Sequence, residues 1–497
     1  MPSELRAHPA RPSWLRARLW LWISAGLLMA GALAGVFKAQ RPGGPPAVYL
    51  MAARGDADID PRALQQLTQW QLEACGFAVL PERVPGTPLP DGLDRNTLLL
   101  ELQGRRDGDR LVLNWRSAAL AAVRSSGDRA WRDDVHQGDP QGTLGAMLQR
   151  LPSPEKPAMG IALPPERPEN FWKLLKALEG SWDFTRINPS LVLTQEILKE
   201  EPSSPSALIL RGDLLYRLLL VDPASDAALR PESEACFLKA LEISPDLPQA
   251  VFLLVQLRTD AGDHRGALTV LQRALRVHPY APTLLTALGY AARTAGLLDL
   301  AREALERRNA LGPSSLMNSG AENSWLYLGM WDRFEAELID EKDRPRGSVV
   351  AFYRGYLALA RGKREEAAAS FHACQEGAVF GQFGRLGEIY ELICRNRTDE
   401  ARARLHALSE DRVSLHVPDG EFSFKLAEAY ALIGDRGDAI DMGAKAFSQG
   451  FGCTHWYQHS PFVGDLQSSP RWQALLQHLQ ERQRLLEGRF PPSSFKP

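Results

Sequence analysis

Residues 245–313 read PDLPQAVFLLVQLRTDAGDHRGALTVLQRALRVHPYAPTLLTALGYAARTAGLLDLAREALERRNALGP, and this stretch contains one pattern twice. Pro245, Pro279 and Pro313 stand 34 residues apart. Small residues recur at the same interval, at Gly262, Gly296, Ala267 and Ala301. Because a small residue lets two antiparallel helices approach closely and a proline ends the second helix, the period predicts an array of helix–turn–helix units.

The same phase continues further along the chain. It is carried by Gly355, Gly362, Ala367, Phe371, Ala401, Gly434 and Ala439. This pattern resembles the tetratricopeptide repeat family. The resemblance implies an all-α solenoid that binds proteins or peptides and rarely carries out chemistry.

The repeats are expected to cover residues 169–450. Three irregularities interrupt them: an insertion near residues 221–231, a slip of phase between Pro313 and Gly347, and a four-residue insertion around residues 412–420. A helix with three leucines, Leu475, Leu476 and Leu479, follows the repeats. Residues 451–490 are therefore predicted to form a helical cap that covers the last apolar face.

The first 37 residues predict a membrane anchor. Residues 19–37 contain no charged side chain, and this length suits a helix that crosses the hydrocarbon layer. Four arginines precede it, at Arg6, Arg11, Arg16 and Arg18. The asymmetry places residues 1–18 in the cytoplasm and the body of the protein in the periplasm, as a single-pass protein of a bacterial inner membrane.

The same segment has two further interpretations. Ala32-Leu33-Ala34 resembles a signal-peptidase site, so a protein secreted after cleavage at Ala34 is the alternative to an uncleaved anchor. Gly31 and Gly35 form a GxxxG pair, through which two such helices would form a homodimer.

After a linker at residues 38–46, the pattern changes to mixed strands and helices. A small α/β domain is expected at 47–153, followed by a Pro-rich linker at 154–168. The expected strands are 47–53, 77–80, 97–103 and 110–115, and the expected helices are 61–76 and 143–151. The strands 97–103 and 110–115 flank a polar Asp-Gly turn that is typical of a hairpin.

This order of elements resembles the TolB amino-terminal-like domain over about residues 45–153. Together with one membrane span and the repeats, it resembles the periplasmic half of ToxR/CadC-type membrane regulators. Those relatives carry an output domain on the cytoplasmic side, whereas only about eighteen residues precede the span here. The resemblance therefore implies a sensing or scaffolding part and no DNA-binding or cyclase activity.

The first helix of each unit is expected to line a concave groove for a protein or peptide. The predicted groove residues are Gln249, Gln256, Thr286, Tyr290, Arg293, Phe352, Tyr356 and Tyr390. Tyrosine and arginine are favoured because they tolerate a partly hydrated groove and often dominate binding energies. Phe252 and Leu386 are expected on the same face. The apolar side chains there, such as Phe352 and Leu386, have the alternative role of packing between neighbouring helices.

A search for catalytic and metal-binding motifs finds none of the common ones. The sequence lacks GxGxxG after a strand, GxxxxGK[ST], GxSxG and HExxH. Cys453, His455 and His459 have a spacing that would suit zinc on a helix, but no fourth ligand follows them. Asp56, Asp58 and Asp60 alternate before the helix expected from Pro61, and Asp60 is predicted to cap that helix rather than to bind calcium. The prediction is a non-enzymatic protein with no cofactor and no metal site.

Composition narrows the choice of partner. The formal net charge is −2, so no basic field favours nucleic acid. The five cysteines are too few and too scattered for a disulfide framework. Cys374 and Cys394 fall on consecutive repeat helices, so a single bridge between them is the alternative to two buried thiols.

The predicted fold is thus α+β, with one N-terminal transmembrane helix, a small α/β domain and an all-α tetratricopeptide solenoid. The predicted function is a membrane-anchored periplasmic scaffold or adaptor for a protein or peptide partner. The alternative is a signal-sensing component that binds a small ligand in the α/β domain and relays the change to a partner with an output domain.

Overall fold

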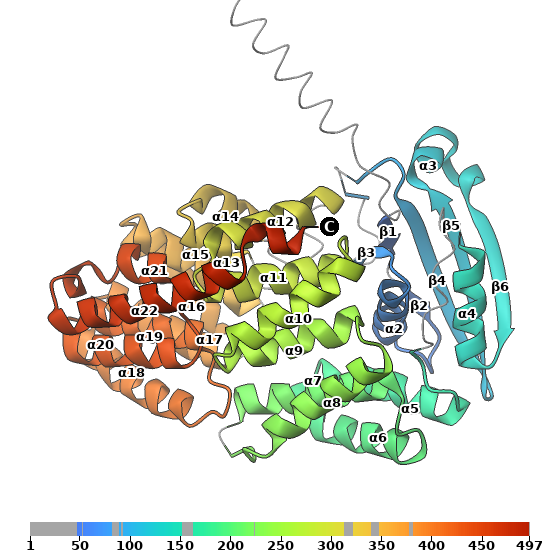
Figure 1. Cartoon of the computed structure of the whole chain (residues 1–497), viewed down its shortest axis with the longest axis horizontal. Helices are drawn as coiled ribbons and strands as arrows, with labels where there is room; N and C mark the ends of the chain where they lie inside the picture. Colours follow the sequence, from blue (N-terminus) through green and yellow to red (C-terminus); the bar gives the residue numbers. More distant parts are fainter. Residues whose placement is uncertain are drawn as a thin grey trace, which may run out of the picture. The chain divides into compact units, whose positions relative to one another are not determined.

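The computed structural model describes residues 47–51, 53–81, 89–90, 93–151, 163–222, 224–312, 322–338, 347–376 and 381–496. A small mixed sheet comes first, and helices follow it to the end of the chain (Figure 1). The predicted cytoplasmic segment, membrane helix, Gly31–Gly35 pair and first linker all lie outside the described residues. Within the described residues, no helix combines the length and the apolar composition needed to cross a membrane.

The sheet domain contains six strands and three α-helices among the described residues. Its elements are β1 (Ala47–Leu50), β2 (Arg54–Gly55), α2 (Pro61–Ala74), β3 (Ala78–Pro81), β4 (Leu98–Asp107), β5 (Arg110–Ala119), α3 (Leu120–Ser126), η1 (Gly127–Ala130), β6 (Arg132–Gly138) and α4 (Pro140–Arg150). The main strand order is β3-β1-β4-β5-β6, with β2 paired to β4. β1 is parallel to β3 and β4, whereas β4, β5 and β6 are antiparallel.

Alternating side chains give the sheet two different faces. Val48 and Leu50 point into the core that also holds α2 and α4, whereas Ala47 and Tyr49 belong to a smaller cluster with Leu120 of α3. The expected hairpin is confirmed, since β4 and β5 pair around a turn in which Gly108 has φ +61°. β6 and α3 were not predicted.

Helix α2 begins where the sequence indicated. The Asp60 carboxylate accepts hydrogen bonds from the backbone N–H groups of Arg62, at 2.8 Å, and Ala63, at 3.1 Å. Pro61 stands in the first turn, where its missing N–H costs nothing. The predicted capping role of Asp60 is confirmed.

The repeats are antiparallel helix pairs. Their helices are α5 (Pro168–Ser181), α6 (Ile187–Glu200), α7 (Pro205–Val221), α8 (Leu229–Ile243), α9 (Pro248–Asp260), α10 (His264–Val277), α11 (Pro282–Thr294), α12 (Leu298–Leu311), α13 (Asn323–Tyr327), α14 (Trp331–Glu337), α15 (Gly347–Ala360), α16 (Arg364–Glu376), α17 (Gly381–Cys394), α18 (Thr398–Val413), α19 (Gly420–Leu432) and α20 (Arg436–Ser448). A short 3-10 turn, η2 (Phe184–Arg186), joins α5 to α6. The short helices α13 and α14 explain the slip of phase between Pro313 and Gly347.

Helix crossings follow the predicted pattern. A Cβ atom added to Gly355 on α15 would come within 2.8 Å of the Phe371 ring on α16, so only glycine allows this approach. Gly262 and Gly296 have φ +84° and +87° in the turns between paired helices, a conformation that favours glycine. The 34-residue period of small residues therefore reflects both the helix crossings and the turns between paired helices.

The chain ends in a helical cap. It consists of α21 (Thr454–His459), η4 (Gly464–Leu466), α22 (Pro470–Arg489) and η5 (Pro492–Phe495). In Figure 1, α22 runs from the orange helices of the last repeat toward α12. All five cysteines are free thiols, so the disulfide considered for Cys374 and Cys394 is absent.

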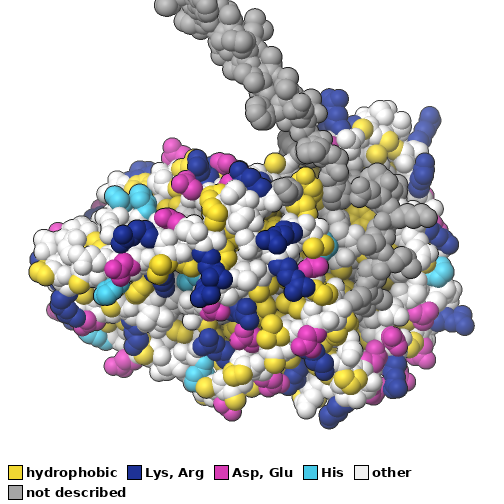
Figure 2. All heavy atoms as spheres, in the orientation of Figure 1, with side chains coloured by type: hydrophobic (Ala, Val, Ile, Leu, Met, Phe, Trp, Pro, Cys, Tyr) yellow, Lys and Arg dark blue, Asp and Glu magenta, His cyan; other side chains and the backbone are white. Residues whose placement is uncertain are grey.

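The sheet domain and the first repeats share one apolar core. Leu67 and Trp70 of α2 belong to the same buried cluster as Phe171 of α5 and Leu254 of α9. On the face drawn in Figure 2, side chains of both charges are interspersed, in agreement with the small net charge.

Candidate partner-binding site

The predicted groove residues all lie on the first helices of their repeats. Gln249 and Gln256 are on α9, Thr286, Tyr290 and Arg293 on α11, Phe352 and Tyr356 on α15, and Tyr390 on α17. Gln249, Gln256 and Tyr290 are half-buried, and the other five are buried. In this conformation only the first three have surface to offer a partner.

The protein covers much of this face with its own elements. At one end, α2 packs against α5 and α9, and the Thr283 hydroxyl of α11 donates a 2.7 Å hydrogen bond to Glu73 of α2. Burial raises the pKa of Glu73 to about 7, although hydrogen bonds from Gln69 and Thr283 act against this rise. The sheet domain thus contacts the N-terminal ends of the first helices.

At the other end, α19 meets α11, α13 and α15. The Arg293 guanidinium forms an ion pair with Glu421 of α19, and the two side chains are 1% and 8% exposed. Asn323 donates a 2.8 Å hydrogen bond to the same carboxylate, and the Tyr327 hydroxyl also donates to it. Burial acts to lower the pKa of Arg293, but the Glu421 carboxylate and the surrounding tyrosines together outweigh this effect and raise it.

A second buried carboxylate lies beside this pair. Asp260, the last residue of α9, accepts hydrogen bonds from the hydroxyl groups of Tyr216 and Tyr290. Burial and the nearby Asp419 carboxylate raise the pKa of Asp260 to about 7. Asp419 caps α19 and has φ +46°, which is unusual for a residue other than glycine.

A third polar group surrounds Tyr356 and Tyr390. Lys425 and Glu428 of α19 form a 3.2 Å ion pair that is almost fully buried. The Tyr356 hydroxyl donates to Glu428 at 2.7 Å, and the Tyr390 hydroxyl donates to the Lys425 carbonyl at 2.9 Å. Burial lowers the pKa of Lys425. These tyrosines therefore serve the interior of the fold in this conformation.

Helix α19 thus carries a charged stripe that faces inward. Glu421, Lys425 and Glu428 are four and three residues apart, so they share one side of the helix. Sequence reasoning missed them, because charges at this spacing are typical of a face exposed to solvent. Phe352 instead contacts other rings, with its centroid 5.5 Å from Phe371 and 5.4 Å from Tyr390.

A separate cleft lies where the sheet domain meets the first repeat. It has a volume of about 590 Å³ and is lined by the loop before α2 and by α5. Carboxylates come from Asp56 and Asp58, and Lys176 contributes an ammonium group that pairs with Glu179 at 3.1 Å. The Arg106 guanidinium also lines the cleft and lies 4.7 Å from the ring of Trp172.

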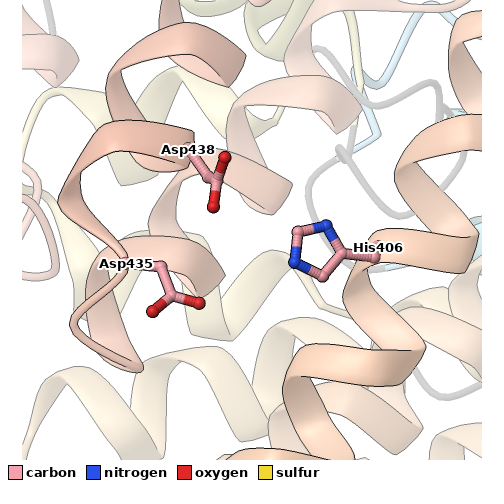
Figure 3. A group of neighbouring side chains, drawn as sticks. All are labelled: His406, Asp435 and Asp438. Atoms are coloured by element: carbon pink, nitrogen blue, oxygen red, sulfur yellow. The ribbon is translucent and has the colours of Figure 1, made fainter.

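Two clusters bear on metal binding. Within the described part of the chain, three potential ligand atoms approach within 4.8 Å of one another only at His406, Asp435 and Asp438, whose side chains Figure 3 shows close together. Arg402 already contacts both carboxylate oxygens of Asp435, at 2.7 and 3.1 Å, and so supplies the counter-charge.

The cluster weighed for zinc in the sequence is arranged differently. The rings of His455 and His459 stack with centroids 4.2 Å apart, while the Cys453 thiol is buried in the core. Burial raises the pKa of this thiol to about 12, whereas both histidines are exposed. This arrangement does not suit a zinc site.

Comparison with known proteins identifies the repeats. The tetratricopeptide repeat family model matches residues 252–315, which span most of α9 to α12. No match was found among the curated proteins. The match and the antiparallel helix pairs together show that residues 252–315 form tetratricopeptide repeats, and such repeats generally mediate contacts between proteins.

Proposed function

We propose that this protein is a non-enzymatic scaffold or adaptor that binds a protein partner through its tetratricopeptide repeats. The observation that carries the proposal is the repeat match at residues 252–315, within an array of antiparallel helix pairs. The absence of nucleotide-binding, nucleophile-elbow and zinc-protease motifs from the sequence supports a role without catalysis.

We further propose that residues 19–37 anchor the chain in an inner membrane, with the repeats on the periplasmic side. The uncharged run and the arginines before it support this orientation. The mass of the mature protein and its need for detergent separate an anchor from cleavage at Ala34. Disulfide trapping of a Gly31→Cys variant tests the homodimer.

Partner binding is assigned to the part of the first-helix face that keeps exposed surface, which includes Gln249, Gln256 and Tyr290. A photo-crosslinking amino acid at Gln249 or Gln256 of the membrane-embedded protein tests the assignment. The same group at Val277, which is 55% exposed at the end of a second helix, is the matched control. Capture of the same protein from both α9 positions and not from Val277 supports the proposal. Equal capture from all three positions argues against a specific face.

The cleft between the sheet domain and α5 supports a second candidate function, the sensing of a small ligand. Its lining offers carboxylates from Asp56 and Asp58 and cations from Lys176 and Arg106, a mixture that suits a zwitterion such as an amino acid. Because two parts of the fold line the cleft, a bound ligand would contact both of them.

The test of this second candidate is a shift in thermal midpoint across a panel of free amino acids. One of them should raise the midpoint of the wild type but not that of Asp58→Asn. Asp299→Asn, at a side chain that is 85% exposed on α12, is the control. If no amino acid raises the midpoint of the wild type, the cleft does not bind this class of ligand.

A further inference from the structure

The apolar interior of the repeats is divided into separate clusters. One contains residues of α9 to α12, including Leu271 and Leu288, and is called here the N-terminal block. Another contains residues of α13 to α21, including Phe352 and Phe424, and is called the C-terminal block. Each block has its own buried side chains, so each has its own source of stability.

Where distant parts of the two blocks meet, the contacts given by the structure are largely polar or between backbones. The Arg293–Glu421 pair joins α11 to α19, and the Gly452 amide donates a 2.7 Å hydrogen bond to the Thr294 carbonyl. A Cβ atom added to Gly450 would lie 2.5 Å from the Thr259 carbonyl, so these backbones touch directly. We call this set of contacts the seam.

Two helices contribute buried side chains to both blocks. On α12, Leu305 lies in the C-terminal block, whereas Leu300 and Ala304 lie in the N-terminal block. The other helix is α22. The N-terminal half of α22 packs Trp472, Leu476 and Leu479 into the C-terminal block. Beyond it, Leu486, Phe490 and Phe495 lie in the N-terminal block, where they are 8%, 3% and 2% exposed. Residues 486–496 are called the strap.

Polar contacts also hold the strap. Arg307 of α12 donates a 2.8 Å hydrogen bond to the Phe495 carbonyl and a 3.1 Å bond to the Pro279 carbonyl. Lys496 lies 3.5 Å from Glu303 of the same helix. The strap is therefore docked on α12 by both side chains and backbone.

We propose that the strap holds the two blocks closed over the seam, and that its release opens the seam and uncovers Arg293 and Tyr290. The polar groups of the seam form hydrogen bonds with water when the seam opens. Opening the seam therefore costs less free energy than exposing an apolar core. The apolar side chains of the strap supply the restraint, because their exposure to water is unfavourable. Opening would free part of the face that α19 now covers.

This inference rests on the proposed function in one respect, namely that the opened face binds the protein partner. The opening itself is measured without any partner, so a failure of the strap leaves the partner-binding proposal untouched.

The test is the rate at which buried thiols react with N-ethylmaleimide, read by peptide mass spectrometry. Cys453 adjoins Gly452 at the seam, whereas Cys374 lies between α16 and α17 inside the C-terminal block, and both are fully buried. In a Phe490→Ala/Phe495→Ala variant, Cys453 should react at least about tenfold faster, with the rate at Cys374 unchanged. Leu485→Ala is the matched control, since Leu485 is 77% exposed beside buried Leu486.

Two outcomes overturn the proposal. If the rates at Cys453 and Cys374 rise together, the strap supports the whole fold and no separate opening exists. If neither rate rises, the strap does not hold the seam.

If the double variant does not fold, hydrogen exchange in the wild-type protein tests the same opening of the seam. Amides in peptides 419–424 and 449–453 should exchange faster than those of α17, through opening of the seam. Exchange of these peptides only at the rate of global unfolding would contradict the proposal.

Discussion

The Arg293 guanidinium and the Glu421 carboxylate are 128 residues apart in sequence and form an ion pair almost excluded from water. Taking both charges out of water is costly, and only the partner and the surrounding hydrogen bonds offset that cost. Asn323 and Tyr327 supply such bonds to Glu421. The pair is therefore sensitive to the loss of either member.

Arg293→Met should lower the free energy of unfolding by about 3–5 kcal/mol, because it leaves a buried carboxylate without its cation. Denaturant titration measures the change. The double variant Arg293→Met/Glu421→Leu should lose less than the sum of the single variants. Arg302→Met, at a 48% exposed arginine that pairs with Asp299, should cost less than about 1 kcal/mol. Strictly additive losses in the double variant would show that the two side chains do not depend on each other.

Asp260→Asn should make stability less dependent on pH. Burial raises the pKa of Asp260 to about 7 in the folded state. Between pH 4 and pH 7, the folded state therefore keeps a proton on this group that the unfolded state has already released. The stability from this group is therefore present below pH 4 and is lost as pH rises to 7. Relative to wild type, the variant should gain stability between pH 4 and 8, by roughly 4 kcal/mol at most.

Tyr216, Tyr290, Asp419 and Glu421 face this carboxyl group and are unchanged in the variant. Urea unfolding at each pH gives the comparison, with Asp299→Asn as the exposed control. A difference between wild type and Asp260→Asn that stays constant with pH would contradict the prediction.

Gly355→Ala should destabilise the fold by about 1–3 kcal/mol, because the new methyl group would press on the Phe371 ring. Gly437→Ala provides the matched control on α20, where an added Cβ meets nothing within 4 Å. This control should gain up to about 1 kcal/mol from the better helix propensity of alanine. Thermal unfolding of both variants distinguishes crowding from propensity, and equal effects would exclude the crowding at Gly355.

Asp60→Ala should cost about 0.5–2 kcal/mol, because the first turn of α2 loses the acceptor for two backbone N–H groups. Asp60→Asn keeps a capping oxygen and should restore most of the loss. Chemical denaturation of the whole chain measures both. If Asn fails to restore stability, the carboxylate acts through its charge and not as a cap.

The features that the sequence predicted correctly are those set by local interactions or by the repeat. The crossing at Gly355 and the cap at Asp60 each depend on residues close in sequence or related by the repeat, so a pattern reveals them. The strand β6, with the sequence RDDVHQG, escaped notice because its side chains are mostly polar at the edge of the sheet. Its position depends on pairing with β5, which no local signal records.

For the predicted groove, the sequence indicated the positions of the residues along the helices but not their burial. The spacing placed Arg293, Tyr356 and Tyr390 on first helices, as the structure has them. It could not show that α19 packs against that face, since no period relates Glu421 to Arg293. Burial of these side chains is a property of long-range packing, and their role toward a partner stays a prediction.

The contact between Lys496 and Glu303 also affects how the chain folds. A solenoid whose repeats touch only their neighbours can unfold one repeat at a time from either end. Here the residues that follow α22 rest on α12, and the contact of Lys496 with Glu303 closes a loop of almost two hundred residues. We expect the repeats of this protein to lose their structure together, in one slow and cooperative transition.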